Sequence, residues 1–450
     1  MTTSQARQLL VTIVAALCIT ILLLVPFHAF LTVWAGSNFG HYTTIRLWKE
    51  MLLGLATVLA AILLLTNKPL KRQFARDKLF IIIGLYAALV LLSGVAAYYF
   101  HKVSRVGYAD GALLDLRFLL FFVVTWVLTK HSSIIYMNWR KILIGPAMAV
   151  IFFGVLQRLA LPYDALKHVG YGPNTIQPYE TVDQKNAYVR LQSTLRGANP
   201  LGAYLVVVMA AIATMVTRVK QRVGKLYWLL WVGIGLAGLF VLFFTYSRSS
   251  WLGAVVSVGV LILLGMRHRK YLWRTAALAG LVAVLVGGGL LFAFRHNDRV
   301  QNTFFHTDEH SHSSISSNYG HMAALKNSSR DIVRDPFGTG AGTAGPASVH
   351  NQLGPTRIAE NYYVQIAQET GVIGLALFLT ILVLVAVELY RREYDSLARV
   401  LFSSLIGLSL VGLLSHVWAD DTLAYLWWGF AGVAVARLKP KMSTKDAPAD

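Results

Sequence analysis

The chain has few charged residues and almost no cysteine. Only 14% of its 450 residues are charged, against roughly a quarter in soluble domains, while 56% are hydrophobic. A single cysteine, Cys18, excludes an internal disulfide. This composition excludes an ordinary soluble protein and indicates one that lies largely in a membrane.

Apolar runs recur along the whole chain. Each is about 20 residues long, enough to cross a hydrocarbon core about 30 Å thick at about 1.5 Å per residue. We expect an all-α polytopic membrane protein with about 12 transmembrane helices. The first run follows a short polar start and is expected to stay as a helix, not to be removed as a signal peptide. The expected spans are 9–34, 44–66, 79–100, 112–129, 142–160, 197–217, 226–246, 250–266, 273–294, 366–388, 398–416 and 423–437.

Acidic residues are scarce: 21 Asp and Glu stand against 41 Lys and Arg, which gives a net charge of +20. Most of the basic residues lie in short segments between apolar runs. Basic segments of a membrane protein are retained on the cytoplasmic side, and this rule explains the positive charge more simply than binding to nucleic acid does. We therefore expect no nucleic-acid partner. We therefore expect a multi-pass protein of the cytoplasmic (inner) membrane with both termini cytoplasmic. The segments are 67–78, 130–141, 218–225, 267–274, 391–399 and the tail after 437.

Two long polar segments fall on the opposite, extracytoplasmic side. They cover about residues 161–196 and 295–365, and neither contains an apolar run. Because a structureless loop of such length is uncommon, we expect short helices in the second segment, including an amphipathic one over 318–333. The expected organisation is membrane helices in 1–294, a loop subdomain in 295–365, and further membrane helices with a tail in 366–450.

The first candidate site is Arg-Gly-Ala-Asn-Pro at 196–200, which opens the sixth expected span. Asn199 before a proline is typical of a helix start, and free N–H groups beside Arg196 could hold an anion. The second is Thr-Tyr-Ser-Arg-Ser-Ser-Trp at 245–251, where Arg248 lies near the outer interface and its planar guanidinium suits phosphate or carboxylate. In both cases the alternative is an arginine that only reaches toward lipid headgroups.

The long polar segment carries three further motifs. Residues 328–342 contain Arg330 and Arg334, followed by glycines in alternation that permit tight turns. No Gly-Lys-Ser/Thr follows, so this is not a nucleotide-binding P-loop. Glu360 and Asn361 then lead to Glu-Thr-Gly-Val-Ile-Gly at 369–374; Glu360 could be a general base or simply an acid that favours a helix start. His350 could also supply a base or an acceptor contact.

Weaker signals remain. Four histidines flank Asp308 and Glu309 in the long segment, but their spacing does not favour a metal site over a solvated loop, so we expect no metal. Asp115 and Arg117 lie near the outer end of the fourth span, where we expect a local polar contact with a structural role. The histidines are His306, His310, His312 and His321.

Taken in order, these motifs resemble those of the O-antigen ligase and O-antigen polymerase superfamily. The resemblance covers about residues 196–375, through Arg-Gly-Ala-Asn-Pro at 196–200, Ser-Arg-Ser-Ser-Trp-Leu-Gly at 247–253, Arg-Asp-Pro-Phe-Gly-Thr-Gly-Ala-Gly at 334–342 and Ala-Glu-Asn with Glu-Thr-Gly-Val-Ile-Gly at 359–374. Each motif is weak alone, whereas four in the same order, all expected on the outer side, are fairly specific.

The resemblance implies a metal-independent, inverting glycosyltransferase without a cofactor. Such an enzyme moves a glycan from undecaprenyl pyrophosphate to an acceptor hydroxyl of a polysaccharide or glycolipid at the outer face of the membrane. In this family, arginines at the positions of Arg196 and Arg248 are expected to bind the pyrophosphate. Asn199, Arg330, Arg334, His350 and Asn361 are the further candidates for substrate binding.

One position departs from the family pattern. Many ligases have His-Asn where this chain has Glu360-Asn361, and that histidine is thought to assist the acceptor hydroxyl. Glu360 could act as the base instead, or His350 could supply it from the loop. The change favours polymerase-like members, including teichuronic-acid or capsule polymerases, over a strict lipopolysaccharide ligase.

Two other classes of protein compete with an enzyme. A transporter or flippase of lipid-linked sugars would place its coupling charges near the middle of the bilayer, whereas the candidate charges here lie at the outer boundary. A non-catalytic membrane scaffold would need neither Arg196 nor Arg248. The sequence therefore favours chemistry at the outer membrane surface.

Overall fold

The computed structural model describes residues 3–182, 185–219, 224–266 and 317–437, with a few residues between 292 and 303. Nine helices in these residues are long and apolar enough to cross a membrane. The first is continuous through α1 (Thr3–Leu24), η1 (Val25–Phe27) and α2 (His28–Phe39). The others are α4 (Trp48–Thr66), α6 (Lys78–Tyr99), α7 (Arg105–Thr129), α8 (Ile134–Leu159), α9 (Ala198–Val219), α10 (Lys225–Phe244), α11 (Arg248–Met266) and α15 (Tyr362–Tyr390).

Shorter elements complete the described chain. Two apolar helices of 16 residues each follow α15. A two-stranded antiparallel hairpin, which the sequence did not suggest, pairs Glu180 with Arg190. The shorter elements are α3 (Tyr42–Arg46), α5 (Lys68–Arg76), η2 (Ala165–Val169), β1 (Glu180–Val182), β2 (Lys185–Arg190), α14 (Ser317–Arg334), η4 (Pro346–His350), α16 (Ser396–Val411) and α17 (Asp421–Ala436).

The expected all-α polytopic fold is confirmed. A helix covers the greater part of each expected span except 273–294, most of which lies outside the described residues. The expected amphipathic helix over 318–333 is also present, as α14. Several helices begin earlier than expected, and the differences are largest for α7 and α8. Helix α7 starts at Arg105, because Ser104 caps it by accepting a hydrogen bond from Gly107 N at 3.1 Å, and α8 starts at Ile134.

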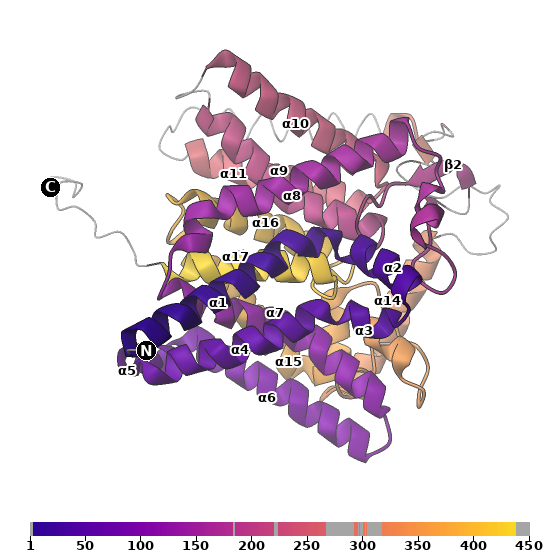
Figure 1. The fold of residues 1–450 in the computed structure, drawn as a ribbon. Helices are drawn as coiled ribbons and strands as arrows, with labels where there is room; N and C mark the ends of the chain where they lie inside the picture. The colour runs from indigo at the N-terminus through magenta and orange to yellow at the C-terminus, as the bar shows by residue number, and fades with distance from the viewer. Residues whose placement is uncertain are drawn as a thin grey trace, which may run out of the picture.

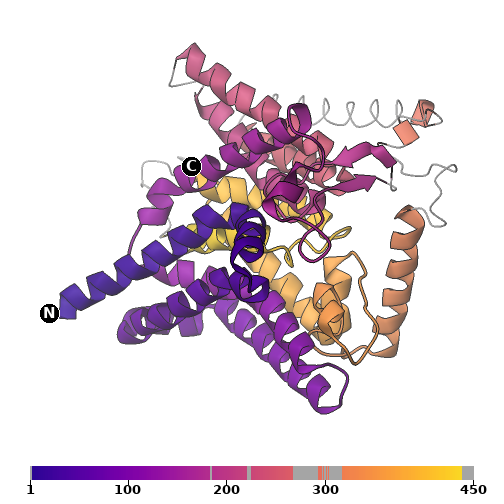
Figure 2. The same cartoon turned by 45° about the vertical axis from the view of Figure 1, so that its right-hand side comes forward.

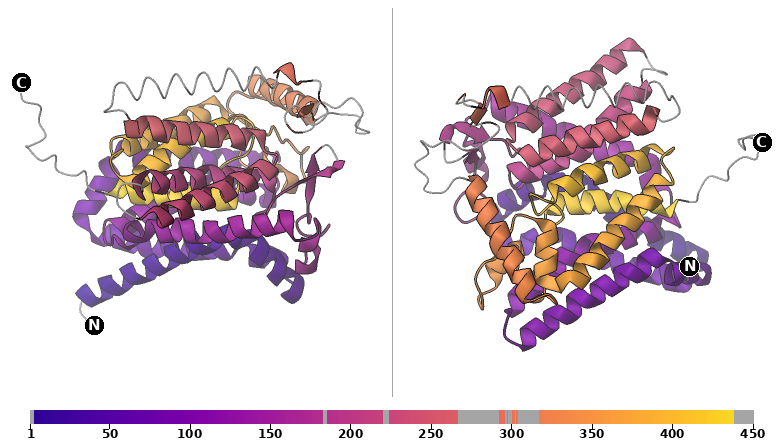
Figure 3. Two further views of the ribbon diagram at one scale, coloured as in Figure 1. Left: turned by 90° about the horizontal axis from the view of Figure 1, so that it is seen from above. Right: turned by 180° about the vertical axis from the view of Figure 1, so that it is seen from behind.

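The helices form a bundle with two distinct ends. The start of α1, helix α5 and the end of α17 lie at one end, which we call the terminal end (Figure 1). The β1–β2 hairpin, α3 and α14 lie at the other, which we call the loop end (Figure 1). The views in Figure 3 show the same division, and Figure 2 shows α14 along the outside of the molecule at the loop end.

Helix α17 lies in the centre of the bundle. Every residue from Thr422 to Ala436 is buried, and α17 packs against α7 and, less extensively, against α9. Trp418, Trp427 and Trp428 form a cluster of rings with centroids 5.2–5.6 Å apart. A helix that is apolar on every side favours such a buried position. Helices from before and after the long polar segment therefore share one core.

Helix α15 is broken near its start, and the long segment packs into the break. Gly371 has φ +70°, which only glycine adopts without strain. Val372 N donates to Pro336 O at 3.0 Å, and Thr339 N donates to Gln368 O at 2.8 Å. Residues 335–345, which we call the glycine loop, therefore satisfy the backbone groups that the break exposes.

The glycine loop approaches α7 so closely that no side chain fits between them. A Cβ built on Gly111 of α7 would lie 2.2 Å from Gly342 N, and one built on Gly342 would lie 2.0 Å from Gly107 O. Both obstacles are backbone atoms, so neither can rotate away. The other two glycines of the loop are confined by different helices: a Cβ on Gly338 would lie 2.5 Å from Glu369 O of α15, and one on Gly340 would lie 2.8 Å from Ser93 O of α6.

Replacing Gly111 with alanine is expected to destabilise the protein by about 1–3 kcal/mol, because the added methyl group forces the glycine loop away from α7. Gly84→Ala is the matched control, since a Cβ there meets nothing within 4 Å. Thermal unfolding of the purified protein in detergent should show a lower Tm for Gly111→Ala only. Equal Tm values for the two variants would contradict the close packing.

Candidate functional site

A cavity of about 500 Å³ opens at the loop end. Residues at the starts of α9, α11 and α15 line it, and we call it the Arg248 cavity. The first turn of a helix has free N–H groups and the positive end of the helix dipole, so three such starts together favour an anion. The lining residues are Arg190, Asn199, Tyr246, Ser247, Arg248, Ser249, Met322, Leu325, Ala359, Glu360, Asn361, Leu413 and Leu414.

Arg190, which the sequence analysis did not single out, forms part of the wall of this cavity. It ends β2, and its guanidinium donates to Thr245 O at 2.9 Å and to Asn199 Oδ1 at 2.6 Å, with Glu180 Oε2 at 3.4 Å. Burial lowers the pKa of Arg190, and the nearby Glu180 and Glu360 carboxylates oppose that effect. Arginine stays charged in proteins, so Arg190 is a fixed positive group in the cavity.

Asn199 has a different role from the expected helix cap. Helix α9 begins at Ala198, so Asn199 lies inside the first turn, and its side-chain oxygen accepts from Arg190. It therefore links the hairpin to α9.

Glu360 is exposed in the same cavity and has an unusual backbone conformation. Its φ of +52° is rare for a residue with a side chain, and strain of this kind persists only where the surroundings enforce it. The next residue, Asn361, caps α15 by accepting from Val364 N at 3.0 Å and donates to Leu413 O at 2.9 Å. Asn361 thereby fixes the start of α15 and the direction of Glu360.

A second, smaller cavity of about 140 Å³ is lined by Ala419 and Asp420 of the segment between α16 and α17, whereas Leu413 and Leu414 of that segment line the Arg248 cavity. We call it the Arg196 cavity. Arg196 lines it together with Arg46, Asp110, His350 and Asp420. The structure thus places two of the expected site residues, Arg196 and His350, apart from Arg248, Asn199, Glu360 and Asn361, which share the larger cavity.

Arg196 acts on two titratable groups in the segment before α17. Burial, and to a smaller extent the nearby Arg196, lowers the pKa of His416 to about 4, so His416 is neutral at physiological pH. Burial raises the pKa of Asp420, whereas Arg196 lowers it. Among the described residues, neither Arg196 nor Arg46 forms an ion pair, so both guanidiniums are available to a ligand.

His350 is held by a carboxylate from a membrane helix. The ring nitrogen that faces the carboxylate is Nδ1, which lies 2.6 Å from Asp110 Oδ2 of α7. A carboxylate at one imidazole nitrogen orients the ring and favours proton transfer at the other. His350 therefore has the surroundings of a general base, but it lies in the Arg196 cavity and not in the one that contains Arg248.

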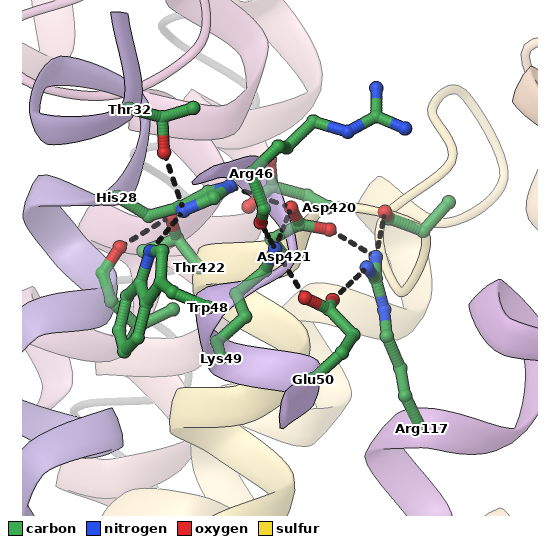
Figure 4. A network of polar contacts seen from close by, with 12 residues as sticks. His28, Thr32, Arg46, Trp48, Lys49, Glu50, Arg117, Asp420, Asp421 and Thr422 are labelled. Atoms are coloured by element: carbon green, nitrogen blue, oxygen red, sulfur yellow. Dashed lines mark hydrogen bonds and ion pairs between the residues drawn. The ribbon is translucent and has the colours of Figure 1, made fainter. Parts of the chain in front are cut away.

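A network of buried charges lines part of the Arg196 cavity (Figure 4). Asp421 accepts from His28 Nε2 at 3.1 Å and from Lys49 Nζ at 3.0 Å, and it also pairs with Arg117. Glu50 pairs with both Lys49 and Arg117, at 3.0 and 3.2 Å. Two cations face two carboxylates, so the network is balanced, as buried charges require, and it joins α4, α7 and α17.

The network corrects the expectation of a polar contact between Asp115 and Arg117. Residues two apart on a helix point in different directions. Arg117 reaches Glu50, Asp421 and the carbonyl of Ala419, the last at 2.8 Å. Among the described residues, neither carboxylate oxygen of Asp115 has a hydrogen-bond partner.

The other expected site residues lie elsewhere. Arg330 and Arg334 are exposed on α14, and neither lines the two cavities, to which α14 contributes only Met322 and Leu325. His306, His310 and His312 and the side chain of His321 lie outside the described residues. Within the part of the chain that the structure describes, no group of three or more His, Cys, Asp or Glu residues gathers to hold a metal.

Sequence reasoning missed Arg46, Asp110 and Arg190. Arg190 lies only six residues before Arg196, in a segment with few other charges, and this proximity was a usable signal. Arg46 and Asp110 carried no comparable signal, because each stands alone near a helix start and gains its meaning from helices far away in the sequence.

Comparison with known proteins gives two similarities. Residues 234–379, which include Arg248 and Glu360, match the family described as O-antigen ligase. The chain is also 22% identical over 379 residues to the teichuronic acid biosynthesis protein TuaE of Bacillus subtilis (strain 168), across 81% of this chain and 73% of that protein.

The family match, the related protein and the helical membrane fold lead to one conclusion. The chain is a multi-pass membrane protein that is similar to the O-antigen ligase family over residues 234–379, and this similarity supports a role in the ligation or polymerisation of a cell-surface polysaccharide.

Proposed function

We propose that this protein transfers a glycan from undecaprenyl pyrophosphate to an acceptor hydroxyl in the Arg248 cavity, at the outer face of the cytoplasmic membrane. The observation that supports this most strongly is the meeting of Arg248 and Glu360, which are distant in the sequence, in one cavity. They supply the two groups that the reaction needs: a cation for the leaving pyrophosphate and a carboxylate for the acceptor proton.

The cavity also suits a lipid-linked substrate. Met322, Leu325, Leu413 and Leu414 line it opposite the polar residues, and three of these side chains are largely exposed. An apolar wall beside fixed guanidiniums can accommodate a polyprenyl chain and its pyrophosphate together. A cavity of about 500 Å³ also has room for sugar residues next to the reacting atoms.

The proposed reaction breaks the bond between the anomeric carbon and the pyrophosphate oxygen. Negative charge grows on the leaving group, and the Arg248 and Arg190 guanidiniums stabilise it because they are already in place. Glu360 accepts the proton of the acceptor hydroxyl, whose oxygen attacks the anomeric carbon from the opposite side. The configuration at that carbon is inverted, and neither a metal nor a cofactor is needed.

Arg196 is proposed to assist from the neighbouring cavity. Gly197 and Ala198 alone separate it from Asn199, which lines the Arg248 cavity. Arg46 adds a second cation beside it. Pyrophosphate carries several charged oxygens, so guanidiniums on both sides of the first turn of α9 can share its charge.

The orientation follows from the basic segments. Helix α5 and residues 130–141 and 391–399 connect helices at the terminal end, which we place in the cytoplasm with both chain termini. The loop end, with both cavities, then faces outward, where no nucleotide is available. A lipid pyrophosphate donor carries its own leaving group, so the reaction needs no nucleotide.

We propose a polysaccharide or glycolipid as the acceptor. Glu360 in place of the ligase histidine favours a polymerase-like enzyme, and the name of TuaE connects that protein with a cell-surface polysaccharide. A transporter of lipid-linked sugars is less well supported, because the cavity residues lie at helix starts at one end of the bundle.

Substitution of either arginine tests the pyrophosphate site. Arg248→Ala and Arg196→Ala should each abolish glycan transfer, because the leaving group loses charge stabilisation. Donor accumulation, measured by chromatography of lipid-linked glycans, reports the loss, and immunoblotting of membranes reports protein level. Arg391→Ala is the control, since Arg391 is an exposed arginine paired with Glu388 at the terminal end. Full activity in Arg248→Ala would overturn the proposed site.

The identity of the base is tested by two amide substitutions. Glu360→Gln should slow transfer by about 10²-fold or more, because the amide cannot accept the proton. His350→Gln should have a much smaller effect, because His350 lies in the other cavity. Initial rates with a synthetic lipid-linked donor compare the two. The reverse order of effects would assign the base to His350.

Chelation tests the absence of a metal requirement. Activity of the purified enzyme should survive EDTA, because arginines replace a metal in neutralising the pyrophosphate. Loss of transfer that returns on addition of a divalent cation would contradict the proposed mechanism.

A further inference from the structure

A further cavity, of about 570 Å³, opens at the terminal end of the bundle, opposite the two cavities of the loop end. Three parts of the chain form it: the start of α5, the turn between α7 and α8, and the end of α17. We call it the Lys130 cavity. Its lining residues are Asn67, Pro69, Leu70, Gln73, Thr129, Lys130, Ser133, Ala436 and Arg437.

The lining of this cavity carries positive charge and no carboxylate. Its charged residues are Lys130 and Arg437. Lys130 is half-buried and forms no ion pair among the described residues, and its ammonium lies 5.0 Å from the centre of the Trp126 ring. Arg437 pairs with Asp395, which is outside the lining, at 2.8 Å. Because a partly buried charge is costly without a counter-ion, Lys130 favours an anion in the cavity.

Two carboxylates line an adjoining cavity, and both have partners other than Lys130. The adjoining cavity, of about 240 Å³, shares Gln73, Lys130 and Arg437 with the first and is also lined by Asp77 and Glu388. Asp77 caps the start of α6 by accepting a backbone hydrogen bond at 2.9 Å. Glu388 pairs with the two arginines that follow α15. The positive charge of Lys130 is therefore not matched by an ion pair on either side.

Helix α5 places further positive charge beside the cavity. Its nine residues join the ends of two spans, α4 and α6, so the helix lies at the surface of the membrane. Leu70 is buried, and Phe74 stacks on Phe80 with ring centroids 4.4 Å apart, which fixes one face of α5 against the bundle. The remaining surface of α5 is exposed and basic, without an ion pair among the described residues. It carries Lys68, Lys71, Arg72 and Arg76.

This combination favours a phospholipid of net negative charge over other anions. The phosphate of a phospholipid lies at the depth where a span ends, and Lys130 directly follows α7. Exposed apolar side chains lie close in the sequence to the lining residues: Leu65 near the end of α4 and Met137 in the first turn of α8. Acyl chains pack against such surfaces, whereas a soluble phosphate gains nothing from them. A zwitterionic lipid carries its own cation and gains less from Lys130.

We propose that the Lys130 cavity binds the phosphate of an anionic phospholipid from the membrane leaflet at the terminal end. Lys130 and Arg437 neutralise the phosphate, and Gln73 and Ser133 can donate hydrogen bonds to its oxygens. The inference is independent of the proposed function, because the site lies at the opposite end of the bundle from the proposed reaction and its test requires no transfer activity.

Native mass spectrometry of the full-length protein in neutral detergent measures this binding. Phosphatidylglycerol is the anionic probe, and phosphatidylcholine with the same acyl chains is the zwitterionic one. The unsubstituted protein should bind phosphatidylglycerol about tenfold more tightly or more, because two cations face the headgroup. An equal concentration of inorganic phosphate should not displace it, because phosphate lacks the acyl chains.

Substitutions that remove one charge each locate the bound lipid. Lys130→Gln should weaken phosphatidylglycerol binding by about fivefold, which is the contribution of one basic residue near an anionic headgroup, and leave phosphatidylcholine binding unchanged. Lys130→Arg should retain the affinity because it retains the charge. Lys71→Gln is the matched control, since Lys71 is an exposed lysine of α5 that does not line the cavity, and it should have little effect. Equal unfolding temperatures of the three variants in phosphatidylcholine verify that each is folded.

Three results would overturn the proposal. Equal weakening by Lys130→Gln and Lys71→Gln would show diffuse attraction to a basic surface and no defined site. Equal affinities of the unsubstituted protein for the two lipids would exclude selection for negative charge. Displacement of phosphatidylglycerol by an equal concentration of inorganic phosphate would assign the cavity to a soluble anion. Absence of glycan transfer, by contrast, would refute the proposed function alone, because the lipid measurements do not depend on it.

Discussion

The break in α15 is the feature on which the loop end depends. In a membrane, backbone groups that leave a helix need partners from the protein itself. The glycine loop supplies them, and it can do so only because glycines at 111 and 342 let two backbones touch. Once the loop is docked, His350 and Glu360 have little freedom of position, because few residues separate His350 from the loop and Glu360 from α15. The arrangement of both cavities therefore depends on a backbone contact that involves no catalytic side chain.

The charges of the protein fall into two kinds. Arg117, Lys49, Glu50 and Asp421 neutralise one another inside the bundle and join helices that are far apart in the sequence. Arg46 and Arg196, which line the smaller cavity, are different, because neither has an acidic partner among the described residues. Balanced charge joins the helices, whereas under the proposed function these two guanidiniums bind an anionic ligand.

The two cavities refine the view of the reaction that the family resemblance suggested. Where the resemblance implied a single pyrophosphate site formed by Arg196 and Arg248, the structure places the two arginines in different cavities. Arg190 joins Arg248 on one side, and Arg46 joins Arg196 on the other. This division gives the base candidates different surroundings, since Glu360 faces the larger cavity and His350 the smaller.

The sequence by itself determined the membrane fold, the helix α14 and the motifs from which Arg248, Asn199, Glu360 and Asn361 were selected. The membrane fold follows from the length of the apolar runs, and helix α14 and the motifs follow from local residue patterns. Only the tertiary structure decided that Arg117 pairs with Glu50 and Asp421 and not with Asp115. It also brought in Arg46 and Arg190 and placed Arg330 and Arg334 outside the cavities. Such partnerships depend on how distant helices pack, and no local pattern in the chain specifies that.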